Sequence, residues 1–121
     1  MTKQTLTGTC HCGAVTWQAV MPANWDPASA YLCNCSLCRR KQQITAIVPL
    51  DYFTLVKGHD ALSCYQWNKQ IAKHYFCATC GVYTHHQRRG DPNSYGLNLA
   101  CVDDIDLAAL TIGVIDGKAL D

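Results

Sequence analysis

The sequence has little net charge and few charged residues of either sign. Ten Lys and Arg face nine Asp and Glu, so the formal net charge is +1, and charged residues make up only 16% of the 121-residue chain. A strongly basic surface is the usual sign of nucleic-acid or anionic-membrane binding. The absence of such a surface argues against both kinds of partner. It therefore also argues against a zinc-ribbon protein that binds nucleic acid.

The sequence also lacks a long hydrophobic run. The longest, residues 107–115, is interrupted by Thr111 and Gly113 and is too short to cross a bilayer. The first nine residues contain no apolar segment of the kind that a signal peptide needs. We therefore expect a soluble cytoplasmic protein, in a compartment where thiols stay reduced.

Repeats, low-complexity segments and linkers are missing as well, which favours one domain over residues 1–121. Short segments of strand-forming residues alternate with turn residues, a rhythm typical of a mainly β fold. Helix signals are scarce: one turn after Ser36, one at 49–53 and weak helical character at 104–112. The expected strands are 14–20, 30–33, 44–48, 62–67, 72–76, 81–86 and 95–101.

Cysteine, in contrast, is abundant. The chain has nine, and seven of them fall into three short motifs. A dense cysteine pattern in a reducing compartment indicates metal ligation rather than disulfide bonds. Cys64 and Cys101 stand alone, and the motifs are Cys10-His11-Cys12, Cys33-Asn34-Cys35-Ser36-Leu37-Cys38 and Cys77-Ala78-Thr79-Cys80.

Two of the motifs supply a complete set of four ligands for zinc. Cys77 and Cys80 bracket a tight turn, and Gly81 behind them can adopt a positive φ. Cys10 and Cys12 would present both sulfurs on one face of an extended segment. A tetrahedral site built from these four cysteines would clamp the N-terminal third to the C-terminal half and stabilise the fold directly.

The third motif supplies only Cys33, Cys35 and Cys38. Three ligands leave one coordination position open, which is typical of catalytic rather than structural zinc. Two alternatives remain from the residues alone. The second site could be closed by Cys64, Cys101 or a histidine, or the motifs could exchange partners between the two sites.

The three motifs and their order resemble the glutathione-dependent formaldehyde-activating enzyme family, which shares its domain with centromere protein V. The resemblance rests on residues 8–15 (GTCHCGAV), 33–40 (CNCSLCRR) and 76–81 (FCATCG), and it continues to residues 101–104 (CVDD). It implies an Mss4-like, β-rich fold with two Zn²⁺ ions. Within it, Cys10, Cys12, Cys77 and Cys80 would hold a structural zinc, and Cys33, Cys35 and Cys38 a catalytic one.

The activity that the resemblance implies is that of a carbon–sulfur lyase, the condensation of formaldehyde with glutathione to S-hydroxymethylglutathione. We expect a substrate thiol to take the open zinc position and to attack a small aldehyde. Arg39 and Arg40 could pair with the carboxylates of a glutathione-like ligand, or could simply face solvent. The competing hypothesis is a non-catalytic zinc module that binds a partner or acts like a chaperone, because a fold does not fix a function.

Histidines are assigned lesser roles from the sequence. His11 lies between two ligands, and we expect it to be structural or to face solvent. One residue of the pair His85-His86 could act as a general base, but a surface strand pair is the favoured interpretation. His74 has no partner at an informative spacing.

Overall fold

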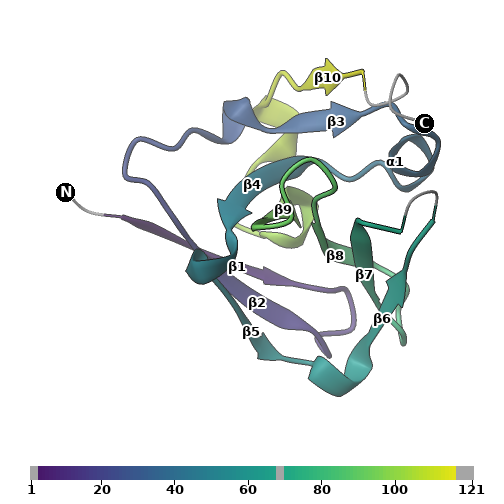
Figure 1. The fold of residues 1–121 in the computed structure, drawn as a ribbon. Coiled ribbons are helices and arrows are strands. Elements are labelled where there is room, and N and C mark those ends of the chain that lie inside the picture. The colour runs from purple at the N-terminus through teal and green to yellow at the C-terminus, as the bar shows by residue number, and fades with distance from the viewer. Residues whose placement is uncertain (1–2, 68–69, 117–121) are drawn as a thin grey trace.

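The computed structural model describes residues 3–67 and 70–116, and most of them lie in two β-sheets (Figure 1). The smaller sheet is antiparallel, with strand order β1-β2-β5. Its strands are β1 (Gln4–Thr9), β2 (Thr16–Met21) and β5 (Phe53–Lys57).

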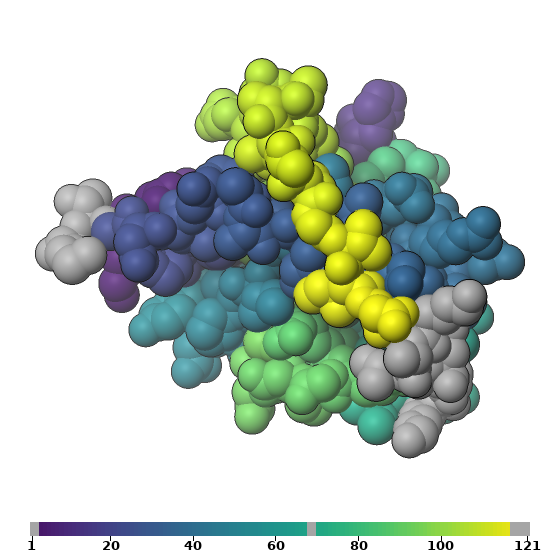
Figure 2. Space-filling view, turned by 90° about the horizontal axis from the view of Figure 1, so that it is seen from above, coloured from purple at the N-terminus to yellow at the C-terminus, as the bar shows by residue number. Residues whose placement is uncertain are grey.

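The larger sheet has seven strands in the described part of the chain, in the order β10-β3-β4-β9-β8-β7-β6. All neighbours are antiparallel except β10, which pairs in parallel with β3. In Figure 2 the yellow C-terminal segment accordingly runs across the blue residues around β3. The strands are β3 (Tyr31–Cys33), β4 (Thr45–Pro49), β6 (Leu62–Tyr65), β7 (Lys73–Cys77), β8 (Tyr83–Gln87), β9 (Ser94–Asn98) and β10 (Gly113–Ile115).

In the described part of the chain, helical structure is limited to short segments. The α-helix, α1 (Ser36–Lys41), joins β3 to β4 and ends where Gln42 adopts a left-handed conformation with φ of 54°. None of the helices in the described residues is long and apolar enough to cross a membrane. The 3-10 helices are η1 (Pro27–Ser29), η2 (Leu50–Tyr52), η3 (His59–Ala61), η4 (Leu99–Cys101) and η5 (Leu107–Ala109).

The core joins the two sheets. Trp17 and Met21 alternate with outward residues along β2 and are fully buried, as period-two patterning requires of a sheet with one covered face. They pack with Val48 of β4 and Leu97 of β9 in one apolar cluster. The apolar packing fixes the position of the smaller sheet against the centre of the larger one.

The mainly β fold expected from the sequence is confirmed, with α1 at the expected place after Ser36. Three expectations are wrong in detail. Cys10 to Cys12 is not extended, because residues 11 and 12 form the turn between β1 and β2. The strand expected at 95–101 ends at Asn98, whose side chain accepts a hydrogen bond from Ala100 N at 3.2 Å and starts η4. Within 104–112 only η5 is helical.

Candidate metal centres

The first candidate centre is formed by Cys10, Cys12, Cys77 and Cys80, here called the four-cysteine cluster. Their sulfur atoms all lie within 4.8 Å of one another. The Sγ atoms of Cys10 and Cys12 are 3.7 Å apart, and those of Cys12 and Cys77 are 3.6 Å apart. A tetrahedron with metal–sulfur bonds of about 2.3 Å has edges of about 3.8 Å, so the spacing fits zinc.

Two similar turns build this cluster from different sheets. Cys10 and Cys12 lie between β1 and β2, whereas Cys77 ends β7 and Cys80 lies in the turn that leads to β8. Gly81, which follows the second pair, has φ of +78°, as its place behind a tight turn predicts. The cluster therefore joins the smaller sheet to the larger one.

Backbone amides around the four-cysteine cluster favour thiolates. Val15 N donates to Cys10 Sγ at 3.3 Å, and Thr79 N donates to Cys77 Sγ at 3.4 Å. The backbone amides of Cys12 and Val82 lower the pKa of the Cys80 thiol to about 6. The backbone amide of Cys80 likewise lowers the pKa of the Cys77 thiol. At Cys12 the backbone hydrogen bond from Ala14 acts to lower the pKa, but desolvation and the neighbouring thiols outweigh it and raise the pKa to about 11. Thiolates are the zinc-binding form of cysteine, and the backbone amides favour that form at Cys77 and Cys80.

The second candidate centre is formed by Cys33, Cys35 and Cys38, here called the three-cysteine cluster, with sulfur atoms again within 4.8 Å of one another. Cys33 ends β3, Cys35 caps the N-terminus of α1, and Cys38 lies in the first turn of that helix. Cys35 Sγ accepts a hydrogen bond from Cys38 N at 3.3 Å. Six consecutive residues thus bring three sulfurs together without help from another part of the chain.

The three-cysteine cluster has no fourth ligand among the residues that the structure describes. Within residues 3–67 and 70–116, no further Cys, His, Asp or Glu has a ligand atom at the same range of the three sulfurs. Cys64 is exposed on β6, and Cys101 is buried in η4, where its Sγ donates to Tyr83 O at 3.4 Å. Neither isolated cysteine is brought to either cluster.

A cavity of about 200 Å³ adjoins the three-cysteine cluster and is here called the cysteine cavity. All three sulfur-bearing residues line it, opposite the ends of β7 and β8 and the turn that follows β8. Its other lining residues are Tyr31, Thr45, Trp67, Ile71, Ala72, His74, His86, Arg88, Arg89, Gly90 and Ile115. A separate cavity of about 370 Å³ adjoins Cys10 of the four-cysteine cluster, and none of the other three cysteines of that cluster lines it.

The arginines that line the cysteine cavity are not those expected from the sequence. Arg39 and Arg40 are exposed on α1 and do not line it, and Arg40 Nη1 donates to Ser36 O at 2.8 Å. Arg88 and Arg89 line it instead, from the chain after β8. The guanidinium of Arg88 is held by Ser94 Oγ at 3.1 Å. Nothing in the sequence marks these two residues, because they lie about fifty positions after Cys38, the last residue of the three-cysteine cluster.

Two histidines that sequence reasoning set aside also line the cysteine cavity. His74 of β7 and His86 of β8 are direct partners in the sheet register, and their rings stack with centroids 5.3 Å apart. His85 points to the opposite face and is buried among aromatic rings, including Phe53 at 4.7 Å. The surface pair expected at His85-His86 is therefore wrong, although the two side chains do face opposite sides of the sheet. Period-two alternation separates His85 from His86, but only the register of β7 with β8 brings His86 to His74.

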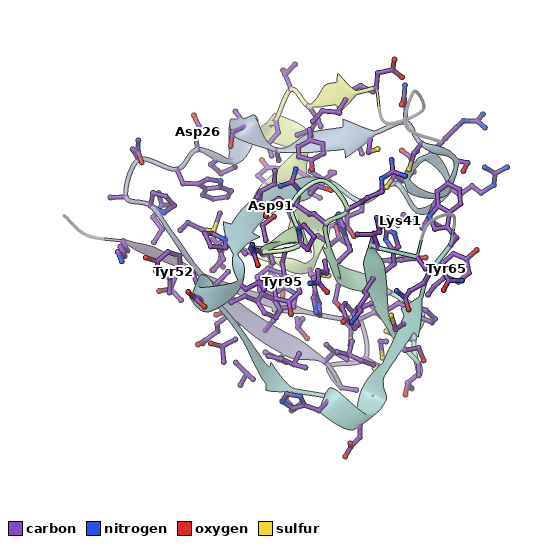
Figure 3. All side chains as sticks on the ribbon, viewed as in Figure 1. Asp26, Lys41, Tyr52, Tyr65, Asp91 and Tyr95 are labelled. Atoms are coloured by element: carbon purple, nitrogen blue, oxygen red, sulfur yellow. The ribbon has the colours of Figure 1, made fainter. Side chains whose placement is uncertain are left out.

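Lys41, the last residue of α1, contacts one of these histidines, His74. Its Nζ lies 3.1 Å from His74 Nδ1 and 4.5 Å from the centroid of the Tyr83 ring. Figure 3 shows Lys41 between α1 and the strand β7. Burial lowers the pKa of Lys41, while the three-cysteine cluster acts to raise it. The helix that carries Cys38 is thereby tied to the floor of the cavity.

Comparison with known proteins gives two findings. The model of the family described as glutathione-dependent formaldehyde-activating enzyme matches residues 5–113 of the chain. A crystal structure of a Rhodobacter sphaeroides protein, determined as a structural genomics target, is similar with 40% sequence identity and a TM-score of 0.84. The match covers 91% of this chain and 100% of that protein.

Proposed function

Because this chain belongs to the glutathione-dependent formaldehyde-activating enzyme family, we propose that it is a zinc-dependent carbon–sulfur lyase-type enzyme. Its substrates would be a small thiol such as glutathione and a small aldehyde such as formaldehyde. One observation carries this proposal: three sulfurs without a fourth ligand in the described chain line a cavity that is large enough for small reactants. A purely structural centre needs neither an open position nor a cavity.

The proposal assigns different tasks to the two clusters. Cys10, Cys12, Cys77 and Cys80 would hold a structural zinc, and Cys33, Cys35 and Cys38 would hold a catalytic zinc. Both donor sets consist only of soft thiolate sulfur, which suits zinc. Zinc bound by three thiolates would supply a position at which a substrate thiol is kept deprotonated.

The cysteine cavity would select the thiol by charge and shape. Arg88 and Arg89 are its guanidinium groups, and guanidinium binds carboxylates through paired hydrogen bonds. Glutathione carries two carboxylates, which makes it a suitable thiol for this wall. In this proposal Arg88 and Arg89 take the role that the sequence suggested for Arg39 and Arg40.

The apolar part of the same wall would serve the aldehyde. Trp67 and Ile71 line the cavity, which has a volume of about 200 Å³. The thiol end of glutathione would enter this cavity while its carboxylates pair with Arg88 and Arg89. The electrophile would share the same space, which favours a small one.

Exchange NMR on the zinc-loaded chain tests the proposal. With glutathione and ¹³C-formaldehyde, the protein should accelerate exchange between free formaldehyde and S-hydroxymethylglutathione above the spontaneous rate. Cys35→Ser should abolish the acceleration, and Cys64→Ser, which alters an exposed cysteine outside both clusters, should retain it. Exchange no faster than in protein-free buffer would contradict the proposal and favour a non-catalytic zinc module.

A further inference from the structure

The floor of the cysteine cavity carries two imidazoles whose tautomers are set by their neighbours. A neutral imidazole has one nitrogen that donates and one that accepts a hydrogen bond, and the partner of one nitrogen decides the role of the other. Each of these rings has a single hydrogen bond to Nδ1. The tautomer of each ring can therefore be derived from that one contact.

For His74 the partner is Lys41. Lys41 Nζ lies 3.1 Å from His74 Nδ1. An ammonium group has three donors and no acceptor, so His74 Nδ1 accepts this bond. The proton of the neutral His74 ring is then on Nε2.

For His86 the partner is Gln43. Its side-chain Nε2 lies 3.0 Å from His86 Nδ1 and 3.2 Å from Thr45 Oγ1, so both amide hydrogens are paired in this orientation. Gln43 Oε1 is left buried without a partner, but the reverse orientation would leave two hydrogens unpaired. His86 Nδ1 is thus an acceptor, and His86 also carries its proton on Nε2.

The two Nε2 atoms are available to a ligand. Neither has a hydrogen-bond partner among the described residues. Neither is one of the buried side-chain atoms without a partner in that part of the chain, which are Trp17 Nε1 and Gln43 Oε1. Both rings line the cysteine cavity. Gly96, opposite His86 on β9, leaves the space in which the His86 ring lies, since a side chain there would overlap the ring.

Both rings are neutral at physiological pH. Burial lowers the pKa of His74 to about 4, and Lys41 adds to the effect. Burial also lowers the pKa of His86 well below its usual value, and Lys41, His74, Arg88 and His85 act in the same direction. The rings are therefore poor general bases, and a general base at this position, which the sequence left open, is disfavoured.

We propose that His74 and His86 form a pair of neutral N–H donors that binds the carbonyl oxygen of the electrophile and the oxyanion formed from it. This inference rests on the proposed function. When the substrate thiolate adds to the carbonyl carbon, a C–S bond forms and the π electron pair of C=O moves to oxygen. The two Nε2–H groups hold that negative charge until a solvent proton completes the hydroxyl group.

Neutral donors suit this task better than charged ones. An imidazolium would be acidic enough to protonate a thiolate, whereas a neutral imidazole polarises a carbonyl without giving up its proton. Donors fixed before the reaction also need no reorganisation while charge develops. Lys41 and Gln43 act through the two rings and are positioning residues.

Imidazole ¹⁵N NMR of the zinc-loaded wild-type chain tests the tautomers without any turnover. At pH 7 the Nδ1 of His74 and His86 should show the shift of an unprotonated acceptor nitrogen, and their Nε2 the shift of a protonated one. Lys41→Met should remove the preference of His74 for the Nε2–H tautomer and leave the tautomer of His86 unchanged. An Nδ1–H tautomer, or an imidazolium, at either ring of the wild type would overturn the inference whatever the enzyme's activity.

Kinetics then test the role of the donors. His86→Leu should lower kcat for formaldehyde exchange roughly a hundredfold, the usual effect of removing one oxyanion donor. Zinc content and glutathione binding should stay at the wild-type level. His86→Gln, which keeps an N–H near the Nε2 position, should recover part of the rate, and the exposed His59→Gln should change nothing.

These measurements distinguish a failure of the donor-pair inference from a failure of the proposed function. If the wild type exchanges formaldehyde and His86→Leu does so within threefold of it, the donor pair is wrong and the proposed function stands. If the wild type itself does not exchange, the proposed function is wrong.

Discussion

The two cysteine clusters have the same donor chemistry but are assembled by the chain in opposite ways. The four-cysteine cluster joins residues far apart in sequence, such as Cys12 and Cys77, which are separated by 65 positions. The three-cysteine cluster lies within residues 33–38 at the junction of β3 and α1. A metal in the first would close a long loop between two sheets, whereas a metal in the second would cross-link only neighbours.

The surroundings of the two clusters also differ, in burial and in the residues that they contact. Cys10 and Cys77 are buried among Val15, Leu55 and Leu62, which form a small apolar cluster of their own. The three-cysteine cluster is half-buried and faces a cavity with arginines and histidines. The comparison teaches that the long-range cluster is suited to stability and the local cluster to chemistry.

The largest effect is expected from breaking the four-cysteine cluster. Cys77→Ser removes a fully buried sulfur that accepts two backbone N–H groups. Structural zinc contributes an apparent folding energy of about 10 kcal/mol or more, comparable with the whole stability of a domain. The variant should lose its native fold at 25 °C, measured by circular dichroism and amide NMR dispersion. A folded Cys77→Ser with two zincs would contradict the role of this cluster.

The second-largest effect is expected from breaking the three-cysteine cluster. Cys35→Ser should lower the metal content from two zincs per chain to one and abolish formaldehyde exchange while the fold is retained. The reason is that this metal cross-links only residues 33–38 and joins no distant segments. Metal analysis and thermal unfolding measure both effects, with Cys64→Ser as the control that should keep two zincs. Unfolding of Cys35→Ser would remove the contrast between the clusters.

A smaller effect is expected from substituting Gly96, the residue of β9 that lies against the His86 ring. Gly96→Ala would place a methyl group against the His86 ring and force it away from Gln43. Overpacking of this kind costs about 1–3 kcal/mol. Unfolding in urea should show this loss together with a reduced exchange rate. Gly113→Ala, which meets open space on β10, is the matched control and should leave both unchanged.

The smallest effect concerns the thiol. Arg88→Ala or Arg89→Ala should raise KM for glutathione roughly tenfold, since a hydrogen bond between charged groups contributes about 1.5–3 kcal/mol when well formed. KM for 2-mercaptoethanol, which has no carboxylate, should not change. Arg39→Ala and Arg40→Ala serve as controls, because both side chains are exposed outside the cavity. If the controls raise KM and the cavity variants do not, the original expectation for α1 is right.

The parts of the site that could be predicted from sequence are those determined by local spacing. Cys33, Cys35 and Cys38 are close because a strand end and the first helical turn hold them, and Gly81 reports a turn directly. Burial alternates along most of β1 and β5, but the residue types do not show it: the less exposed side of β1 carries Gln4 and Gly8 beside Leu6, and β5 exposes the apolar Val56. Both strands were therefore missed. β10 is exposed throughout, so Val114 and Ile115 show no alternation of buried and exposed positions that would mark a strand.

The cavity floor could not be predicted because it depends on strand register. His74 meets His86 only through the pairing of β7 with β8, and a shift of one residue would exchange His86 for His85. Arg39 and Arg40 follow Cys38 in sequence, yet the helix turns them outward, whereas Arg88 arrives from the end of β8. Nearness in sequence was a poor guide to nearness in the cavity.

Cobalt substitution tests most directly whether one metal ion is bound by the four-cysteine cluster and a second ion by only the three cysteines of the other cluster. The chain loaded with two Co²⁺ ions should change the visible spectrum of one ion when glutathione is added to millimolar concentration, and the other ion should not respond. Cys35→Ser should remove the responsive ion and leave the silent one. A spectrum in which neither ion responds to the thiol would mean that both centres are closed, and would contradict the account.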